Sequence, residues 1–463
     1  MKLSLAQIGQ AMQAVGDYEN SQDLMSTRVQ TDSRLVQPGD LFVCILGQHF
    51  DGHNFAREAV HKGALAVVVE RPLLDLSSEV PMLLVQDSIA ALAALAAFWR
   101  TQFQGRVVAV TGTAGKTSVK EMIASILEQG ADVGKNYKNW NNLLGVSLSI
   151  LGMHGREDYW VLEAGVSETG EMEDLAAILA PDVAVLVNVG PAHLQGLSSV
   201  HGVAKEKARL METVSAKGVA VINLDYPELV QAISEQRDVS ILTFSAWADT
   251  VADCLLVEEQ TDPGTGHTLR MRCQETRIEL HLPTERSWIG ENVLAAACTT
   301  RYLGCSPVDI QAGLARVCLP EHRGQIIECG LMTIIDDCYN ANPLSMRWAL
   351  NWARAKAGTD PLILVLGEMK ELGEQAETSH QELGSWAACT RAAHVFYFGD
   401  YEQAFRKGFV QAGGTGLSHV MDEGEFLRLW RKLGVQSGLV LVKGSRGCAL
   451  ERFVSLLQQE LRA

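Results

Sequence analysis

The chain has 463 residues, too many for a single hydrophobic core, and its length predicts about three domains. Charged residues make up 20% and hydrophobic residues 47%, the balance of an ordinary globular protein. The formal net charge of −16, without a Lys/Arg-rich run, argues against a nucleic-acid-binding surface, and no apolar stretch is long enough to span a membrane.

The cysteines and the N-terminus indicate the compartment. The ten cysteines are scattered, form no C-x-x-C pair and do not cluster with histidine, so the sequence does not predict a structural zinc site. The first 15 residues are too polar and interrupted for a signal peptide. We therefore expect a cytoplasmic protein with reduced thiols, several of them in the core.

Apolar runs divide the chain into three α/β regions. In residues 1–85, "GDLFVCIL", "GALAVVVE" and "PMLLVQD" predict the strands of a small domain, and a helix is expected over 89–103. Residues 86–318 alternate strand and helix, which favours a mostly parallel sheet, with antiparallel strands appended at 245–285. In residues 319–463, four apolar strands with helix-length spacers predict a doubly wound, Rossmann-like domain.

The segment "VVAVTGTAGKTSVKEMIASIL", residues 107–127, reads as a buried strand, a glycine turn and a helix that begins near Lys116. Gly112 and Gly115 allow backbone amides to face an anion at the helix N-terminus. Lys116 would reach the phosphates of a nucleotide and the Thr117 hydroxyl would coordinate Mg²⁺. Val110 stands where the longer phosphate-loop pattern has glycine, so the loop has the shorter G-x-x-G-K-T form. The alternative is a glycine-rich turn that binds nothing.

Two polar side chains follow apolar strands of the central region. Glu163 ends "DYWVLE" and His193 comes after "DVAVLVNVG". Because sites in open α/β sheets lie at the carboxyl ends of strands, both are candidate Mg²⁺ ligands, the carboxylate being the commoner type. Each alone also fits a strand-ending acid or a loop histidine.

Lys207 lies on an apolar stripe. Val203, Leu210 and Val214 recur at helical spacing with it, whereas Lys205 faces the other side. Burying an amine costs free energy unless it is paired, so the position indicates a function. The alternative is a lysine whose stem packs at the edge of an interface while its amine reaches water.

The C-terminal region offers further strand-end candidates. Those in "IIDDCYNANP" are Asp336 and Asp337 after a strand, followed by Tyr339, Asn340 and Asn342. An aromatic ring and amides suit contacts to a nucleoside, although Asn-Pro is also a common turn. Lys443 and Arg446 in "LVKGSRG" form a possible anion-binding pair or a solvated basic turn.

Taken in order, these motifs resemble the Mur ligase superfamily over nearly the whole chain, and most closely its D-alanyl-D-alanine-adding branch. "DSRLVQPGDLFVCILGQHFDGHNF" is similar to its UDP-binding domain. "TGTAGKTSVKEM", "LEAGVSETGEM" and "NVGPAHLQGLSSVHGVAKEK" are similar to its P-loop ATPase domain. "DDCYNANPLSMRWAL", "LVLGEMKELGEQAETSH" and "LVKGSR" are similar to its C-terminal domain. The resemblance implies that residues 1–85 bind the UDP-sugar-peptide, 86–318 bind ATP, and 319–463 close on ATP and bind D-Ala-D-Ala.

The resemblance also implies roles for individual residues. Those implied to bind ATP are Gly112, Thr113, Ala114, Gly115, Lys116, Thr117, Ser118, Asn292, Arg323, Asp337, Tyr339, Asn340 and Asn342. Those implied to hold metal are Thr117, Glu163, His193 and Lys207, the last as a carbamate formed with CO₂. Those implied to bind the other substrates are Ser33, Arg34, Asn141, Asn142, Lys443 and Arg446. Those implied to be catalytic are Lys116, Lys207, His193 and Arg323.

Two departures from the family pattern stand out. Leu143 follows Asn141-Asn142 where the family usually has an acid. Before Asn292, Trp288 and Ile289 occupy the places of a His-Asn pair. We therefore expect altered adenine recognition, in which Trp288 stacks on the base or the base shifts.

The implied reaction uses ATP and Mg²⁺ to join D-Ala-D-Ala to the terminal carboxylate of UDP-MurNAc-tripeptide through an acyl phosphate. Its products are UDP-MurNAc-pentapeptide, ADP and phosphate, and it belongs to peptidoglycan precursor synthesis. We expect a monomer. Alternatives are a diaminopimelate- or lysine-adding ligase, whose D-N-P-R signature is absent, and a P-loop kinase or non-catalytic paralogue. The latter two would not need Lys207 together with Glu163 and His193.

Overall fold

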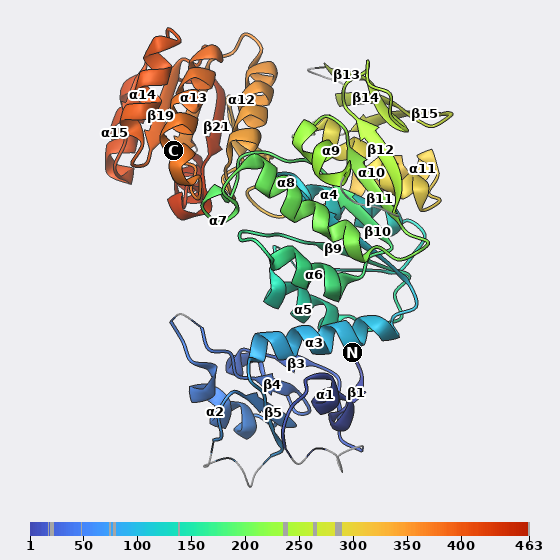
Figure 1. Ribbon diagram of the computed structural model, residues 1–463. Coiled ribbons are helices and arrows are strands. Elements are labelled where there is room, and N and C mark those ends of the chain that lie inside the picture. The colour runs from blue at the N-terminus through green and yellow to red at the C-terminus, as the bar shows by residue number, and fades with distance from the viewer. Residues whose placement is uncertain are drawn as a thin grey trace.

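The computed structural model describes residues 1–16, 18, 23–47, 49–73, 76, 80–137, 139–234, 239–262, 266–282 and 289–461. Figure 1 shows three bodies in chain order: blue at the bottom, cyan to yellow in the middle, and orange to red at the upper left. Each body is built on its own β-sheet, so the predicted α/β class is confirmed.

The N-terminal body is a small parallel sheet with two helices. Its elements are β1 (Leu3–Ser4), α1 (Leu5–Ala11), β2 (Met25–Ser26), β3 (Val29–Gln30), β4 (Leu41–Val43), α2 (Ala56–His61), β5 (Ala66–Val69) and β6 (Met82–Leu84). Strands β3, β4, β5 and β6 pair in that order and all run parallel, while β1 and β2 form a separate antiparallel pair. The three predicted apolar strands correspond to β4, β5 and β6.

Helix α3 (Ser88–Gln102) joins this body to the next. It begins where the Asp87 carboxylate accepts hydrogen bonds from the amides of Ile89 and Ala90, both at 2.8 Å. Its buried side chains belong to one continuous apolar core, which also contains Val43 of β4 and Trp160 of the central sheet. The first two bodies therefore share a core.

The central body carries the predicted phosphate loop. Its first elements are β7 (Arg106–Thr111), α4 (Lys116–Leu127), β8 (Val133–Lys135), α5 (Leu143–Gly152), β9 (Tyr159–Glu163), α6 (Glu171–Leu179), β10 (Val183–Leu186), α7 (Leu194–Leu197) and α8 (Val200–Ala208). The remainder are β11 (Val219–Asn223), α9 (Pro227–Ser234), β12 (Ser240–Ser245), β13 (Cys254–Asp262), β14 (Gly266–Cys273), β15 (Thr276–Leu282), α10 (Gly290–Tyr302) and α11 (Pro307–Arg316).

The strand order of the central sheet explains where its site lies. The order is β15-β14-β13-β12-β11-β10-β7-β9-β8, parallel from β8 to β13. Strand β7 lies between β9 and β10, which the chain forms on opposite sides of it. The carboxyl ends of these three strands therefore meet at a topological switch point, where ligands bind in open α/β sheets. Strands β13, β14 and β15 form the predicted antiparallel extension.

The lysine-bearing stripe is not one continuous α-helix. Helix α8 ends at Ala208, and a 3-10 turn (Arg209–Thr213) follows, because the last helical turn tightens. Lys207 is nevertheless buried and Lys205 exposed, as the spacing predicts.

The C-terminal body is the predicted doubly wound domain. Its elements are β16 (Gln325–Cys329), β17 (Met332–Asp336), α12 (Pro343–Ala357), β18 (Leu362–Gly367), α13 (Ala376–Cys389), β19 (His394–Phe398), α14 (Glu402–Gln411), β20 (Leu417–His419), α15 (Glu423–Leu433), β21 (Gly438–Lys443) and α16 (Glu451–Glu460). The order is β16-β17-β21-β18-β19-β20, with only the edge strand β16 antiparallel among the described strands. The four predicted strands are β17, β18, β19 and β21.

Two further observations concern membrane-spanning helices and disulfides. No helix among the described ranges is both long and apolar enough to cross a bilayer. All ten cysteines lie in described segments and are free thiols, six of them buried.

Helix α4, which follows the phosphate loop, is fixed by a close approach of α11. The Ser125 hydroxyl donates to the carbonyl oxygen of Gly313 at 2.7 Å. A Cβ added at Gly313 would lie 2.4 Å from Cα of Ile126, a separation that real side chains do not adopt.

We therefore expect Gly313→Ala to lower the free energy of unfolding by roughly 1–3 kcal/mol, because α11 must move away from α4. Thermal or urea unfolding measures the change. The matched control is Gly152→Ala in α5, whose Cβ would meet nothing within 4 Å. Equal stability of the two variants would contradict the close packing.

Candidate active site

The phosphate loop lies between β7 and α4 and is held from behind by an amide side chain. Oδ1 of Asn188 accepts hydrogen bonds from the backbone amides of Thr113 at 3.0 Å and Ala114 at 2.9 Å. Its Nδ2 donates to the carbonyl oxygen of Ala114 at 3.1 Å. Two loop amides are thus directed to Asn188, which leaves the N-terminus of α4, starting at Lys116, to face an anion.

Gly115, directly before α4, meets two conformational demands. Its φ is 77°, in the left-handed region that favours glycine. A Cβ there would lie 2.4 Å from Oδ1 of Asn292, which projects from α10 against the loop. This buried Oδ1 has no hydrogen-bond partner in the described part of the chain. Ile289 lines the same space, whereas Trp288 lies outside the described residues.

Glu163, at the end of β9, is buried next to the loop. Its Oε2 accepts from the Thr117 hydroxyl at 2.6 Å and its Oε1 from Nδ2 of Asn141 at 2.7 Å. Burial alone would raise the pKa of this carboxyl, but the charges of Lys116 and Arg323 and these two hydrogen bonds bring the pKa below its usual value. The side chain is therefore a buried, ionised oxygen donor beside a hydroxyl.

Lys207 is 2% exposed. Burial, followed by the charge of Lys116, holds the pKa of its amine well below the usual value for lysine. Within the described residues the amine makes no hydrogen bond or ion pair, although the charges of Glu206 and Glu163 also act on it. Burial therefore favours the uncharged form of this amine, which is the form that can act as a nucleophile.

His193 lies where the central and C-terminal bodies touch. It precedes α7 with a φ of 52°, and its Nδ1 is 2.5 Å from Oε2 of Glu371 in the C-terminal body. A second bridge joins the bodies at the loop itself, where Nδ2 of Asn342 donates to the carbonyl oxygen of Thr113 at 3.3 Å.

The C-terminal strand ends bring a basic group to the same place. Lys443, at the end of β21, is 3% exposed, and its Nζ donates to Oδ2 of Asp337 at 2.6 Å and to the carbonyl oxygen of Asn340 at 3.1 Å. The guanidinium of Arg323 lies over the ring of Tyr339, 4.0 Å from its centre. Nε of Arg323 is buried without a partner among the described residues.

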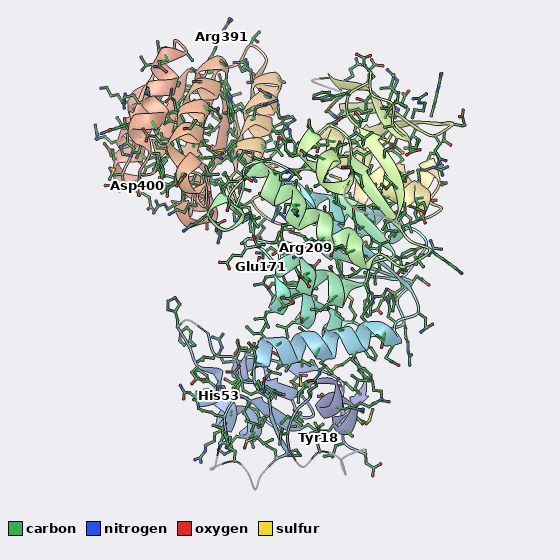
Figure 2. The ribbon with its side chains drawn as sticks, in the orientation of Figure 1. Tyr18, His53, Glu171, Arg209, Arg391 and Asp400 are labelled. Atoms are coloured by element: carbon green, nitrogen blue, oxygen red, sulfur yellow. The ribbon has the colours of Figure 1, made fainter. Side chains whose placement is uncertain are left out.

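A cavity of about 420 Å³ between the two bodies gathers most of the predicted site. The predicted residues that line it are Thr113, Ala114, Gly115, Lys116, Thr117, Ser118, Asn141, Asn142, Glu163, His193, Asn292, Arg323, Asp337, Tyr339, Asn340, Asn342 and Lys443. Glu171 at the start of α6 also lines it and is labelled in Figure 2, beside the central body. Apolar side chains on the opposite wall include Trp348 and Trp352 of α12.

Five predicted site residues do not line this cavity. The carbonyl oxygen of Gly112 accepts from Nζ of Lys116 at 3.0 Å. Lys207 is buried and is not part of the lining. The Arg446 guanidinium, largely exposed, pairs with Glu451 at 2.9 Å.

The last two lie in the N-terminal body. There the Ser33 hydroxyl donates to Glu58 at 2.8 Å and Arg34 pairs with Asp32. Figure 2 labels His53 in this body and Glu171, which lines the cavity, on the other side of α3.

Sequence reasoning missed the residues that support the loop. Oε1 of Glu291 accepts from Nδ2 of Asn188 at 3.3 Å and from Nδ2 of Asn223 at 3.0 Å, and Oε2 lies 3.0 Å from the Tyr226 hydroxyl. Burial raises the pKa of Glu291 to about 8. Asn188 follows β10 closely, so a search of the residues at the carboxyl ends of strands could have found it. Glu291 lies among helix-forming residues, and nothing in the local sequence distinguishes it from them.

The cavity has the phosphate loop on one wall, and charged strand ends of another α/β domain face that loop. This arrangement is typical of P-loop enzymes that hold a nucleotide between two domains. Three family models match this chain. They are the Mur ligase family catalytic domain over residues 26–100, the Mur ligase middle domain over 110–300, and the Mur ligase glutamate ligase domain over 322–446. The chain belongs to the Mur ligase family.

Individual relatives match over nearly their whole length. The UDP-N-acetylmuramoyl-tripeptide–D-alanyl-D-alanine ligase of Escherichia coli (strain K12) is 34% identical, over 94% of this chain and 95% of that protein. The crystal structure of MurF from Acinetobacter baumannii superposes with a TM-score of 0.91 at 28% identity, covering 99% of both chains. The MurF ligase from Thermotoga maritima in complex with ADP has a TM-score of 0.83 at 30% identity, over 95% of this chain and 99% of that one.

The raised pKa of Glu291 generates a prediction about stability and pH. Between the ordinary value of 4.5 and about 8, the folded protein holds a proton on this carboxyl that the unfolded chain has lost. Stability therefore falls as pH rises through this window. Glu291→Gln supplies an uncharged acceptor and donor in the same places, so its stability relative to wild type should increase by roughly 2–4 kcal/mol from pH 5 to 8.

Urea unfolding at several pH values measures this difference. The control is Glu382→Gln, at an exposed position of α13, which should follow the wild-type pH profile. Parallel profiles for Glu291→Gln and wild type would refute the buried-proton interpretation.

Proposed function

We propose that this chain is an ATP-dependent ligase that joins D-Ala-D-Ala to the terminal carboxylate of UDP-MurNAc-tripeptide, in peptidoglycan precursor synthesis. The observation that carries the proposal is the cavity in which the phosphate loop, Glu163 and Lys443 of the other domain face one space. Relatives matched over more than nine-tenths of their length are named for this reaction. For the same reason the diaminopimelate-adding alternative is disfavoured, and membership of the ligase family argues against a kinase.

The proposed chemistry proceeds in two displacements. The substrate carboxylate attacks the γ-phosphorus of ATP, the bond to the β–γ bridging oxygen breaks, and ADP leaves. The amine of D-Ala-D-Ala then attacks the acyl carbon, and phosphate departs as the amide forms. Lys116, the N-terminus of α4 and Arg323 would neutralise the charge on the transferring phosphoryl group. The C-terminal domain would close over the cavity and exclude water, which would otherwise hydrolyse the acyl phosphate.

Thr117 and Glu163 fit a Mg²⁺ ion beside the nucleotide. A hydroxyl and an ionised carboxylate 2.6 Å apart are hard oxygen ligands of the kind that Mg²⁺ prefers. Bound there, Mg²⁺ supplies positive charge to the phosphate oxygens. His193, which lines the same cavity, is proposed as a ligand of a second ion.

Lys207 fits the carbamate that the family resemblance implies. Because burial favours the uncharged form of its amine, the nitrogen can attack CO₂: an N–C bond forms, one C=O π bond of CO₂ opens to give a carboxylate, and the nitrogen loses a proton to solvent. The resulting anion would compensate the positive charge of Lys116 and could join Glu163 and His193 around metal. What supports this is a buried amine without a partner among the described residues, close enough to Glu163 for its charge to act.

The remaining assignments are also proposals. Ser33 and Arg34 in residues 1–85 are assigned to the UDP-sugar, Asn141 and Asn142 to the peptide, and Lys443 with Arg446 to the reacting groups or the dipeptide. Residues 86–318 and 319–463 then supply the ATP site from its two sides. We further propose a cytoplasmic monomer, in which the free cysteines fit a reducing compartment.

We expect purified protein to release phosphate from ATP only when Mg²⁺, UDP-MurNAc-tripeptide and D-Ala-D-Ala are all present, with one new amide per phosphate. Coupled phosphate detection and mass spectrometry of the product measure both. A parallel assay with UDP-MurNAc-dipeptide and diaminopimelate tests the alternative ligase. Phosphate release that does not depend on D-Ala-D-Ala would contradict the proposed reaction.

We expect Lys207→Ala to lower kcat by about 100-fold or more, because a group that orients metal ligands is lost. Short-chain carboxylic acids should restore part of the activity by occupying the place of the carbamate. Lys205→Ala, on the exposed face of the same helix, is the matched control and should remain active. Full activity of Lys207→Ala without added acid would count against the carbamate.

A further inference from the structure

At the end of β17 and in the linker before β16, next to residues that line the cavity, three side chains of different chemistry gather. Nδ1 of His322 lies 2.7 Å from Oδ2 of Asp336, and Sγ of Cys338 donates to Oδ1 of Asp336 at 3.0 Å. One ligand atom from each lies within 4.8 Å of the others. Asp336 and Cys338 are buried and His322 is half-buried, so the cluster has one open side.

Glu451 adds negative charge next to these three side chains. Glu451 acts electrostatically on the Cys338 thiol, as does Asp337. Oε1 of Glu451 pairs with Arg446, but its Oε2 is buried without a hydrogen-bond partner among the described residues. Burial and the neighbouring Asp336 raise the pKa of Cys338, so without a cation the thiol keeps its proton.

From these positions we propose that His322, Asp336 and Cys338 form a binding site for a borderline-soft divalent cation of the Zn²⁺ class, with Glu451 close by. An imidazole nitrogen, a thiolate and a carboxylate are the ligands that Zn²⁺ takes, and they do not suit Mg²⁺, which takes oxygen. On binding, the Cys338 S–H bond breaks, a metal–sulfur bond forms and the proton goes to solvent. The charges of Asp336 and the thiolate then balance the cation.

The place of this cluster gives the proposal a consequence for the cavity. Each of its three residues directly precedes one that lines the cavity: Arg323 follows His322, Asp337 follows Asp336, and Tyr339 follows Cys338. The amide of Tyr339 also donates to the carbonyl oxygen of His322 at 3.0 Å. A cation bound here would restrict the backbone next to three residues that line the cavity. The ligands come from a linker and a strand end, which explains why their sequence spacing shows no metal motif.

The test uses the full-length protein carrying Cys318→Ser and Cys389→Ser, which removes the two exposed cysteines. We titrate it with Co²⁺ and follow thiolate-to-cobalt charge-transfer absorption, then displace Co²⁺ with Zn²⁺. We expect one ion per chain, and one proton released per ion bound. Adding Cys338→Ser should abolish the absorption, whereas Cys329→Ser, a buried cysteine of the same domain, should leave it unchanged.

The half-buried His322 provides a variant expected to keep the fold, which circular dichroism checks. His322→Asn should weaken Zn²⁺ binding at least about tenfold, and Glu451→Gln by less. Absence of the absorption in the starting protein, its persistence after Cys338→Ser, or unchanged affinity in His322→Asn would each overturn the site and leave a hydrogen-bonded cluster. These measurements use neither ATP nor peptide, so their failure is distinct from failure of the ligase reaction.

Discussion

The phosphate loop keeps its shape because one buried amide satisfies its backbone. Asn188 accepts from two loop amides and donates to a loop carbonyl, and its remaining hydrogen points to Glu291. Buried polar groups cost free energy when unpaired, so loop, amide and acid must be arranged together. The loop conformation thus depends on Asn188 after β10, on Asn223 of β11 and on Glu291 of α10, and not on its glycines alone.

The same dependence extends across the interface between the central and C-terminal domains. Asn342 donates to the carbonyl oxygen of Thr113, and His193 pairs with Glu371. The C-terminal domain therefore contacts both the phosphate loop and the start of α7. The cavity exists only as the space between these contacts. Any movement of the C-terminal domain therefore changes which charges face the phosphate loop.

Much of this arrangement could be predicted from sequence, because the signals were local. The strand-turn-helix pattern located Lys116 and Thr117, and strand ends located Glu163, His193 and Lys443. Support of the loop by Glu291 was not predictable, since its partners come from three other elements and α10 hides it among helix formers. The half-buried edge strand β16 was also missed, because its residues lack the continuous apolar run of an interior strand.

The N-terminal and central bodies share the apolar core around α3, and this limits where the chain can be divided into independent domains. Side chains of β4, α3 and the central sheet form one apolar cluster, while the C-terminal domain has cores of its own. Separating the first body from the second would expose the apolar face of α3 to water. A fragment beginning after α3 would likewise leave the central-sheet side chains of this cluster uncovered and should therefore aggregate. The better joint for dissection, or for exchange between related chains, lies in the linker that follows α11.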